Sequence, residues 1–538
     1  MNLFAVRRTL PPLLSILLPF VLLAQPTFQR IVRSDFGQAR AIDRNGSGEL
    51  YVAARHTDST TLVNAVQLIK YDPTGALVWG KLITEPDPGS LFQASAIVST
   101  ADGGVVVTGH HVVGASADST FVIKFDGLGN VLWSARFLAN ATNSTVCKAI
   151  RVEEAPNGDI VVGGEVSQSL TPGGHELFLT RMSGLGAVLW TERIAPPLDG
   201  QTEHFGDLVL PSTGGIVLTA QSFQETAGPW LAKLDDAGVL LWAKRYDSGN
   251  PLLDLRPLRL FETTGGYDIF LRKPFGGFGV RFYRVRTDAE GGMVSAKRFR
   301  ALSDEIGTLL NDVIATGFGY MLAGNRSGID AAEAFLLAID TSGTPQWGMA
   351  YGGSGFETGH AVTATFDGGY LLGGFGETDS LLLERGVPVH ETYLVKTDDN
   401  GHSSGCETPL TFLDSVASFA HDAYTRTTSY TSGWTAATFD INDAYEEIAV
   451  CPDLRVDGIT PAHTFLAYPN PTHGPVLIIL PDRTGTWTLR VLDAIGRPVH
   501  QSRVADRSQL NLSHLIPGRY VIEVRSAGRT ERQQLLKE

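Results

Sequence analysis

The chain repeats itself, and this repeat constrains its fold more than any other feature. Every copy has a turn with a glycine, and in most copies a short apolar run that ends in or near tryptophan follows; the run is weaker after the fifth and sixth turns and absent after the seventh. The marker glycines are Gly75, Gly129, Gly186, Gly238, Gly291, Gly343 and Gly401. Their successive separations are 54, 57, 52, 53, 52 and 58 residues. A near-constant period of this length indicates a repeat architecture.

Each unit contains four strand-like segments separated by turns. In the second unit these are residues 94–99, 105–110, 120–125 and 131–137, with Asp-Gly-Gly and Asp-Gly-Leu-Gly at two of the turns. Glycine and aspartate suit tight hairpin turns. Four antiparallel strands per repeat of about fifty residues are typical of a β-propeller blade. The sequence therefore predicts an all-β chain with a seven-bladed β-propeller in residues 25–407.

The two ends of the repeat region complement each other. The seventh unit has no fourth strand of its own, whereas residues 27–33 resemble a fourth strand that precedes the first unit. We expect residues 27–33 to complete the last blade, because that closes the ring and leaves no sheet edge open between its ends.

The recurring tryptophans have two interpretations. They are Trp79, Trp133, Trp190, Trp242 and Trp347. A large side chain repeated in five units favours packing between neighbouring blades, with its N–H near a turn. Stacking against carbohydrate is the alternative.

The N-terminus is typical of an exported protein. Arg7 and Arg8 precede an apolar segment at residues 10–24 that is too short and too rich in proline to span a bilayer. We therefore expect a signal peptide at residues 1–24, cut between Ala24 and Gln25, with a retained anchor helix as the alternative. No other segment is apolar enough to predict a transmembrane helix.

Charge and cysteine content narrow the function classes. Residues 461–538 hold ten Lys and Arg against six Asp and Glu, so the total net charge of −14 places −18 on residues 1–460. An acidic body disfavours nucleic-acid binding, which needs clustered Lys and Arg. Of the three cysteines, Cys406 and Cys451 flank residues 408–460, a β-rich appendage or linker in which they could form a disulfide.

The last 78 residues carry a different pattern, with short strands at close spacing that predict a small Ig-like β-sandwich in residues 461–538. Three motifs lie here in order. The first contains Tyr468, Pro469, Asn470, Pro471 and Gly474; the second contains Asp493, Gly496 and Arg497; the third contains Leu512, Leu515, Pro517, Gly518 and Tyr520.

This set of motifs resembles the type A C-terminal sorting domain of the type IX secretion system of Bacteroidota; an unrelated Ig-like module is the alternative. The resemblance implies recognition by the secretion machinery and cleavage by a sortase-like protease. It also implies a protein that passes through the periplasm and is then secreted or held at the outer-membrane cell surface.

The sequence presents no catalytic, cofactor-binding or metal-binding motif. Adjacent acidic pairs such as Glu153 and Glu154 point to opposite faces of a strand, and no H-E-x-x-H or nucleophile elbow occurs. Two hypotheses for the propeller remain, because the fold hosts both. It is a binding or adhesion module for an extracellular glycan or protein, which we favour, or a polysaccharide lyase or glycoside hydrolase with its site at the propeller mouth.

Overall fold

The structure is a computed structural model of the whole chain. It describes residues 27–32, 37–58, 63–84, 91–113, 117–137, 147–167, 174–195, 202–223, 228–249, 254–273, 282–301, 308–327, 332–352, 356–377, 390–405, 407–423, 427–430, 434–436, 440–443, 447–449, 466–468, 472–480, 487–492, 497–504, 507–526 and 529–537. The chain divides into two compact units, Met1–Asp453 and Leu454–Glu538, which we describe separately.

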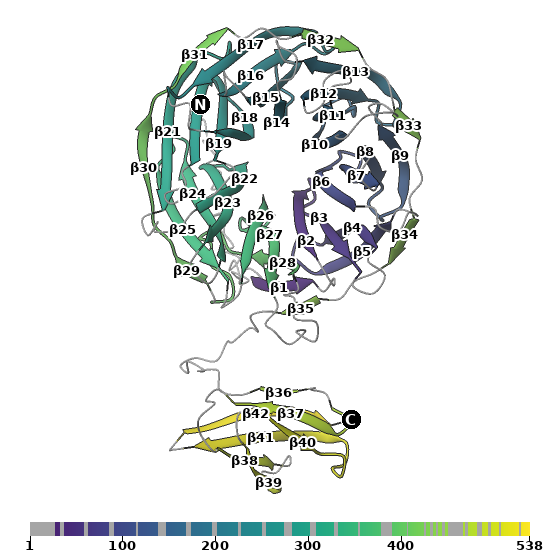
Figure 1. Ribbon diagram of the computed structural model, residues 1–538, viewed down its shortest axis with the longest axis vertical. Helices are drawn as coiled ribbons and strands as arrows, with labels where there is room; N and C mark the ends of the chain where they lie inside the picture. Colours follow the sequence, from purple (N-terminus) through teal and green to yellow (C-terminus); the bar gives the residue numbers. More distant parts are fainter. Residues whose placement is uncertain are drawn as a thin grey trace, which may run out of the picture. The chain divides into compact units, whose positions relative to one another are not determined.

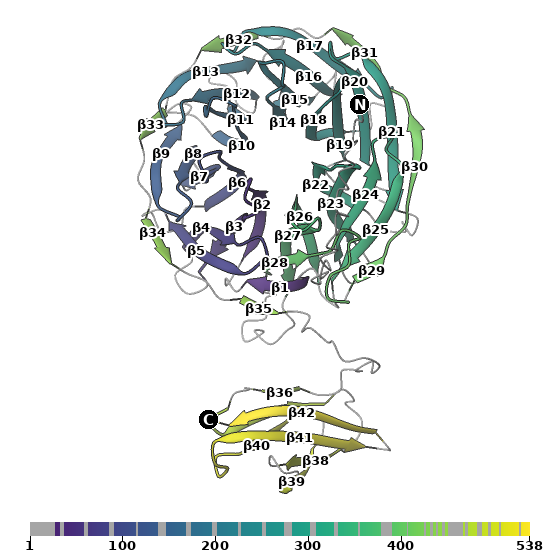
Figure 2. The same ribbon diagram turned by 180° about the vertical axis from the view of Figure 1, so that it is seen from behind.

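In the first unit, the described strands form sheets arranged around a ring (Figures 1 and 2). Five of these sheets have five strands each. A further sheet of ten strands consists of two such sheets joined by a single parallel pair, His175 with Thr202. The described residues thus form seven blades, and in each blade four strands come from the repeat and a fifth lies outside them.

Three strands of every blade follow one another in the chain. The innermost strands of blades 1 to 7 are β2 (Gln38–Arg44), β6 (Leu91–Ser99), β10 (Cys147–Glu154), β14 (Thr202–Val209), β18 (Arg256–Thr263), β22 (Thr308–Ala315) and β26 (Glu357–Ala364). The second strands are β3 (Leu50–Thr57), β7 (Val105–Val113), β11 (Ile160–Ser167), β15 (Ile216–Phe223), β19 (Gly266–Arg272), β23 (Gly319–Ser327) and β27 (Tyr370–Glu377). The third strands are β4 (Asn64–Tyr71), β8 (Ala117–Phe125), β12 (His175–Met182), β16 (Gly228–Leu234), β20 (Phe282–Asp288), β24 (Ala332–Asp340) and β28 (His390–Lys396).

The fourth strand shows how the ring closes. In blades 1 to 6 it is β5 (Leu77–Thr84), β9 (Val131–Phe137), β13 (Val188–Ala195), β17 (Leu240–Asp247), β21 (Met293–Ala301) and β25 (Pro345–Tyr351). In blade 7 it is β1 (Phe28–Val32), which pairs antiparallel with β28 from Phe28 opposite Lys396 to Val32 opposite Thr392. The hydroxyl of Tyr393 in β28 also donates to Oε1 of Gln29 at 2.5 Å. Blade 7 is therefore built from strands at both ends of the repeat region.

The fifth strands come from residues 407–449, which the sequence presents as an appendage or linker. They are β29 (Glu407–Pro409), β30 (Phe412–Ala417), β31 (Ala420–Ala423), β32 (Thr427–Tyr430), β33 (Trp434–Ala436), β34 (Asp440–Asp443) and β35 (Glu447–Ala449). They pair in that order with blades 6, 5, 4, 3, 2, 1 and 7. We call this segment the belt, because it follows the outside of the ring against the direction of the blades (Figure 1). Each belt strand covers an outer edge that would otherwise expose unpaired backbone groups.

Belt residues are also part of the core, namely Leu410, Phe412 and Phe419. Phe412 in β30 is buried between blades 5 and 6, with its ring centroid 5.3 Å from that of Phe335 and 6.1 Å from that of Phe282. The next residue, Leu413, is 37% exposed. Backbone pairing is therefore supplemented here by hydrophobic burial.

The tryptophans lie between blades. Trp79, Trp133, Trp190, Trp242 and Trp347 each pack against the marker glycine of the following blade. An added Cβ would lie 2.5–2.8 Å from the indole of Trp133, Trp242 or Trp347 and 3.3 Å from that of Trp79 or Trp190. The indole Nε1 of Trp133 donates to the carbonyl of Gly184 at 2.9 Å, and that of Trp190 donates to the carbonyl of Asp236 at 3.1 Å. Two interfaces use other side chains in the same way: Arg284 packs against Gly343, and Phe28 packs against Gly75.

The second unit contains a three-stranded and a four-stranded sheet. The strands are β36 (Leu466–Tyr468), β37 (Pro475–Ile479), β38 (Trp487–Leu492), β39 (Pro498–Val504), β40 (Arg507–Asn511), β41 (Gly518–Ser526) and β42 (Arg529–Lys537). The sheet orders are β36–β37–β40 and β39–β38–β41–β42. Side chains of both sheets, including Val476, Leu489 and Ile522, share one hydrophobic core.

Two of the C-terminal motifs meet in this unit. The carbonyl of Gly474 accepts a hydrogen bond from the N–H of Leu512 at 2.8 Å. A Cβ at Gly474 would lie 2.2 Å from Oγ of Ser513, so any other residue there would force the Ser513 side chain to move. Tyr520 is buried, and its hydroxyl donates to the carbonyl of Ile516 at 2.9 Å. These motif residues therefore hold the fold of the unit together.

Truncating Phe412 tests whether the belt contributes to the stability of the ring. We expect Phe412→Ala to lower the free energy of unfolding of the propeller by roughly 3–5 kcal/mol, because it removes a buried aromatic ring. The matched variant Leu413→Ala should change it by less than about 0.5 kcal/mol, since that side chain faces solvent. Urea denaturation followed by tryptophan fluorescence measures both, and equal effects would show that the belt is only peripheral.

A pair of glycine variants tests the packing between blades. Gly158 and Gly186 both have positive φ, at 82° and 85°, but only Gly186 faces a neighbour, since an added Cβ would lie 2.7 Å from Cδ2 of Trp133. Alanine at Gly158 should cost about 1–2 kcal/mol through backbone strain alone. Alanine at Gly186 should cost about 1–3 kcal/mol more, because the indole must also move. The same urea titration compares the two, and equal losses would contradict a tight interface.

Candidate functional site

The innermost strands share a local irregularity that shapes the centre of the ring. Each has a register shift at the equivalent position, which leaves one residue without a partner in the second strand. The skipped residues are Arg40, Ser95, Ile150, Gly206, Leu258, Asn311 and His360. Such β-bulges bend a strand and redirect its side chains.

The residue after the bulge is charged in four consecutive blades. Arg151, Asp207, Arg259 and Asp312 hold this position in blades 3 to 6 and alternate in sign. Nε of Arg151 lies 2.8 Å from Oδ1 of Asp207, and Nε of Arg259 lies 2.7 Å from Oδ1 of Asp312. Nη1 of Arg259 also lies 3.8 Å from Oδ1 of Asp207. A continuous ion-pair chain therefore crosses half of the ring.

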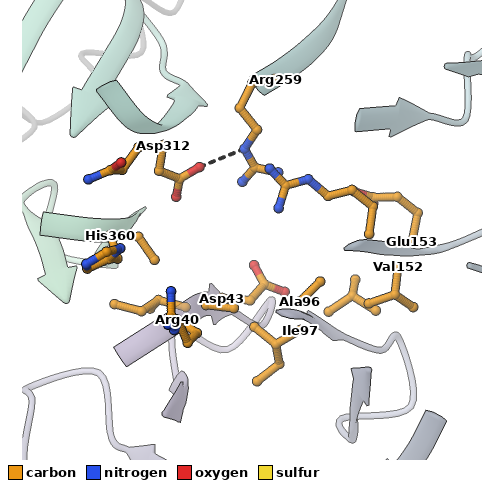
Figure 3. Close-up of a pocket in the computed structure, with 15 residues that line it drawn as sticks. Arg40, Asp43, Ala96, Ile97, Val152, Glu153, Arg259, Asp312 and His360 are labelled. Atoms are coloured by element: carbon orange, nitrogen blue, oxygen red, sulfur yellow. Dashed lines mark hydrogen bonds and ion pairs between the residues drawn. The ribbon is translucent and has the colours of Figure 1, made fainter. Parts of the chain in front are cut away.

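A cavity of about 160 Å³ lies at these strands. Figure 3 shows Arg40, Asp43, Glu153, Arg259, Asp312 and His360 around it. The rest of the lining is mainly aliphatic and comes from blades 1, 2, 3, 6 and 7. Charged groups from blades far apart in the sequence thus surround one small space.

Three carboxylates of the cavity and of the ion-pair chain also connect neighbouring blades. Oδ2 of Asp43 accepts from the N–H and the hydroxyl of Ser99, both at 2.6 Å. Oδ2 of Asp207 accepts from the N–H of Leu260 at 2.8 Å, and Oδ2 of Asp312 accepts from the N–H of Val362 at 2.9 Å. Buried carboxylates need such partners. Asp43, Asp207 and Asp312 therefore have a structural role that accounts for their burial.

Two groups at the cavity lack such partners. No hydrogen bond or ion pair reaches Arg40 or Glu153 from any residue that the structure describes, and Nε of Arg40 is buried. Guanidinium and carboxyl groups in a partly buried site ordinarily find partners within the protein. Arg40 and Glu153 are thus the groups that remain available to a ligand.

Burial decides the protonation of this site. Desolvation, with the nearby Asp207 carboxylate, raises the pKa of Glu153 to about 8. Burial also raises the pKa of Asp43, against the hydrogen bonds from Ser99. Burial and the charge of Arg40 lower the pKa of His360 to about 3. At neutral pH the cavity therefore contains a protonated Glu153, a neutral His360 and cationic arginines.

Sequence reasoning names Glu153 only as half of an adjacent acidic pair without catalytic meaning, and does not single out any other residue of this cavity. The relevant signal is the residue that follows the bulge in each repeat unit. In three units it is alanine, at Ala41, Ala96 and Ala361, whereas in the other four it is Arg or Asp. Glu153 stands two residues after Arg151, which is one of these four. Aligning the seven units by their bulges would have exposed the cluster.

The residues predicted from sequence lie elsewhere. The tryptophans pack between blades and do not line the cavity. Cys147 is buried, and its Sγ lies 3.5 Å from the carbonyl oxygen of Phe137. The expected cleavage site, the disulfide and part of the C-terminal motifs fall outside the described residues; these positions are Ala24, Gln25, Cys406, Cys451, Pro469, Asn470, Pro471, Asp493 and Gly496.

A match to a known protein family identifies the C-terminal unit. Residues 466–538 match the family described as the secretion system C-terminal sorting domain. The chain ends in a type IX secretion sorting domain. This protein is therefore exported by the type IX secretion system to the cell surface or the extracellular space, and its sorting domain interacts with that machinery. In the described part of the chain, no helix is long and apolar enough to cross a membrane.

Solved structures similar to the chain are distant. A protein of unknown function from Dyadobacter fermentans is 12% identical, with a TM-score of 0.38, and the match covers 69% of this chain and 98% of that one. The GH93 α-L-arabinofuranosidase of Fusarium graminearum is 10% identical, with a TM-score of 0.36 and the same coverage. The NanB sialidase of Streptococcus pneumoniae is 10% identical, with a TM-score of 0.36 and 69% coverage of both chains. At this level of similarity an activity is not transferred, and no curated protein matches the chain in sequence.

The raised pKa of Glu153 predicts a pH dependence of stability. Between its ordinary pKa of 4.5 and about 8, the folded chain retains a proton that the unfolded chain loses. The wild-type protein therefore loses stability as pH rises through this interval. Glutamine does not ionise, so Glu153→Gln lacks this loss. We expect the free energy of unfolding of the variant, relative to that of wild type, to increase from about pH 5 to pH 8 by at most about 1.4 kcal/mol per pH unit. Urea titrations of the propeller transition across this pH range measure the gain.

The control is Glu154→Gln, the same change on an adjacent carboxyl that does not line the cavity. It should not reproduce the trend. A difference between wild type and Glu153→Gln that stays constant with pH would show that Glu153 ionises normally.

Proposed function

We propose that the propeller is a binding module that captures an anionic end group of an extracellular ligand in its central cavity. The observation that carries this proposal is the pair of unpartnered groups, Arg40 and Glu153, at one cavity. A guanidinium forms charge-assisted hydrogen bonds with carboxylate, sulfate or phosphate. A protonated Glu153 donates a further hydrogen bond to an acceptor on the same ligand.

The size of the cavity supports capture of an end group. Its volume of about 160 Å³ is below the roughly 300–1,000 Å³ of sites that enclose a whole small molecule. An acidic sugar at a chain terminus, or in a short branch, is the ligand class that suits such a space on an exported protein. We also propose that a sortase-like protease removes the sorting domain after export, which leaves the propeller as the mature binding part.

Binding of acidic saccharides to the full chain and to four of its variants tests the proposal. Uronic-acid-terminated oligosaccharides are compared with their neutral counterparts by isothermal titration calorimetry. We expect saturable binding of the acidic set only. Arg40→Gln should weaken it at least tenfold, since a hydrogen bond to a charged group contributes roughly 1.5–3 kcal/mol. Arg44→Gln, on the same strand but outside the cavity lining, is the control and should bind normally.

Variants at position 153 test whether the residue binds the ligand by donating a hydrogen bond. Its amide still donates a hydrogen bond, so Glu153→Gln should bind at neutral pH, whereas Glu153→Ala should not. Wild-type binding should weaken above about pH 8, where Glu153 ionises, and Glu153→Gln should not show this loss. Equal binding by the Arg40 and Arg44 variants would overturn the proposed site.

Glycoside hydrolysis is a second candidate, and one observation favours it. A carboxyl that is protonated at neutral pH beside an ionisable carboxyl such as Asp43 is what a general acid requires. Glu153→Gln cannot transfer a proton. If wild type converts a bound saccharide to products and Glu153→Gln binds it without turnover, the propeller is an enzyme. If neither converts it, the propeller only binds.

A further inference from the structure

A second cluster of polar side chains lies between blades 3 and 4, away from the central cavity. It consists of Glu165 in β11, His175 in β12 and His204 in β14. Each offers one ligand atom, and these atoms all lie within 4.8 Å of one another. None of the three lines the central cavity.

The backbone places the three residues together. Glu165 pairs with Leu177, which lies two residues after His175, so the side chains of Glu165 and His175 share a face of blade 3. His175 is also the residue that pairs with Thr202 across the two blades. His204 follows two residues later, on the same face as Thr202.

The geometry is close to that of a metal site. Nδ1 of His204 lies 3.4 Å from Oε1 of Glu165, and Nδ1 of His175 lies 3.9 Å from Oε2 of Glu165. Ligand atoms around a tetrahedral zinc ion, with bonds of about 2.0–2.1 Å, are separated by about 3.3 Å. The two histidine–carboxylate separations exceed this value by a few tenths of an ångström. Since the three ligand atoms lie within 4.8 Å of one another, side-chain movements of up to roughly 1.5 Å would bring the set into coordination.

The partners of these atoms point to a missing ligand. The Glu165 side chain is only 4% exposed, yet its Oε2 has no hydrogen-bond partner, and neither does Nδ1 of His175. Its Oε1 accepts from the N–H of Phe205 at 3.0 Å, which holds the carboxylate between the blades. Buried polar atoms without partners are uncommon in folded proteins. Two such atoms, neither with a hydrogen bond, lie 3.9 Å apart here, and Oε2 of Glu165 has Nζ of Lys148 at 3.4 Å as an ion-pair partner.

We propose that Glu165, His175 and His204 bind one divalent transition-metal ion, with zinc as the best fit. Two imidazoles and a carboxylate are ligands that zinc takes, and the fourth position is left to water. The histidines are 21% and 22% exposed, so the ion reaches the site from solvent. Because the ligands come from two blades, the ion would clamp blade 3 to blade 4.

One neighbour opposes the ion. Nζ of Lys148 lies 3.4 Å from Oε2 of Glu165 and competes with a cation for that oxygen. Its side chain is 37% exposed, so it can turn toward solvent when the ion binds. This competition predicts that removal of the lysine charge tightens metal binding.

The test is a titration of the full chain, stripped of metal by chelator and dialysis, with Zn²⁺ in a calorimeter. We expect one site per chain whose affinity falls at least tenfold in His175→Gln and in His204→Gln. Lys148→Gln should instead bind Zn²⁺ several-fold more tightly. The control is His402→Gln, which alters a surface histidine 3.4 Å from Glu407 and should leave the affinity unchanged.

Co²⁺ gives an independent readout. The wild-type chain loaded with Co²⁺ should show visible absorption of tetrahedral intensity that is absent from both histidine variants. Far-UV circular dichroism checks whether each variant is folded. If the histidine variants do not fold, the zinc affinity of Lys148→Gln still tests the proposal. Zinc affinity that is unchanged in the folded histidine variants, or unaffected by Lys148→Gln where they do not fold, would overturn the proposal.

Discussion

A closed ring of sheets holds together only if every blade packs against both of its neighbours. In this propeller the repeated contact is a large side chain at the fourth strand, or next to it, placed over a glycine of the following blade. Trp133 over Gly186 is one example, and Phe28 over Gly75 is the one that joins the last blade to the first. Positive φ and the lack of space both require glycine there. The glycines that mark the sequence repeat are therefore the residues at which neighbouring blades make contact.

The belt addresses a different requirement. Packing between blades leaves the outer edge of every fourth strand with unpaired backbone groups, and such edges promote association between chains. Seven short strands in one segment cover these edges in the described structure. Because β35 pairs with β1, the belt also holds the strand that closes the ring. An exported protein that works outside the cell benefits from a ring without open edges.

The repeat allowed much of the propeller to be predicted, because its strands alternate and its turns contain glycine. Residues 131–137 are an example: the predicted segment coincides with β9. The belt was not recognised, since its strands have three to six residues and little apolar pattern; all four residues of β31 are exposed. Such strands are specified by the backbone edge that they join. Likewise, Arg40 and Glu153 are more than a hundred residues apart, and only the closed ring brings them to one cavity.

The charged residues at the centre of the ring form two groups, which differ in whether they hydrogen-bond to a neighbouring blade. Asp43, Asp207 and Asp312 each accept a backbone N–H from a neighbouring blade, so replacing them would disturb the ring itself. Arg40 and Glu153 have no such hydrogen bond with any residue that the structure describes, and desolvation is the main effect of their surroundings on the pKa of each. The proposed binding function therefore rests on Arg40 and Glu153, whereas Asp43, Asp207 and Asp312 belong to the scaffold.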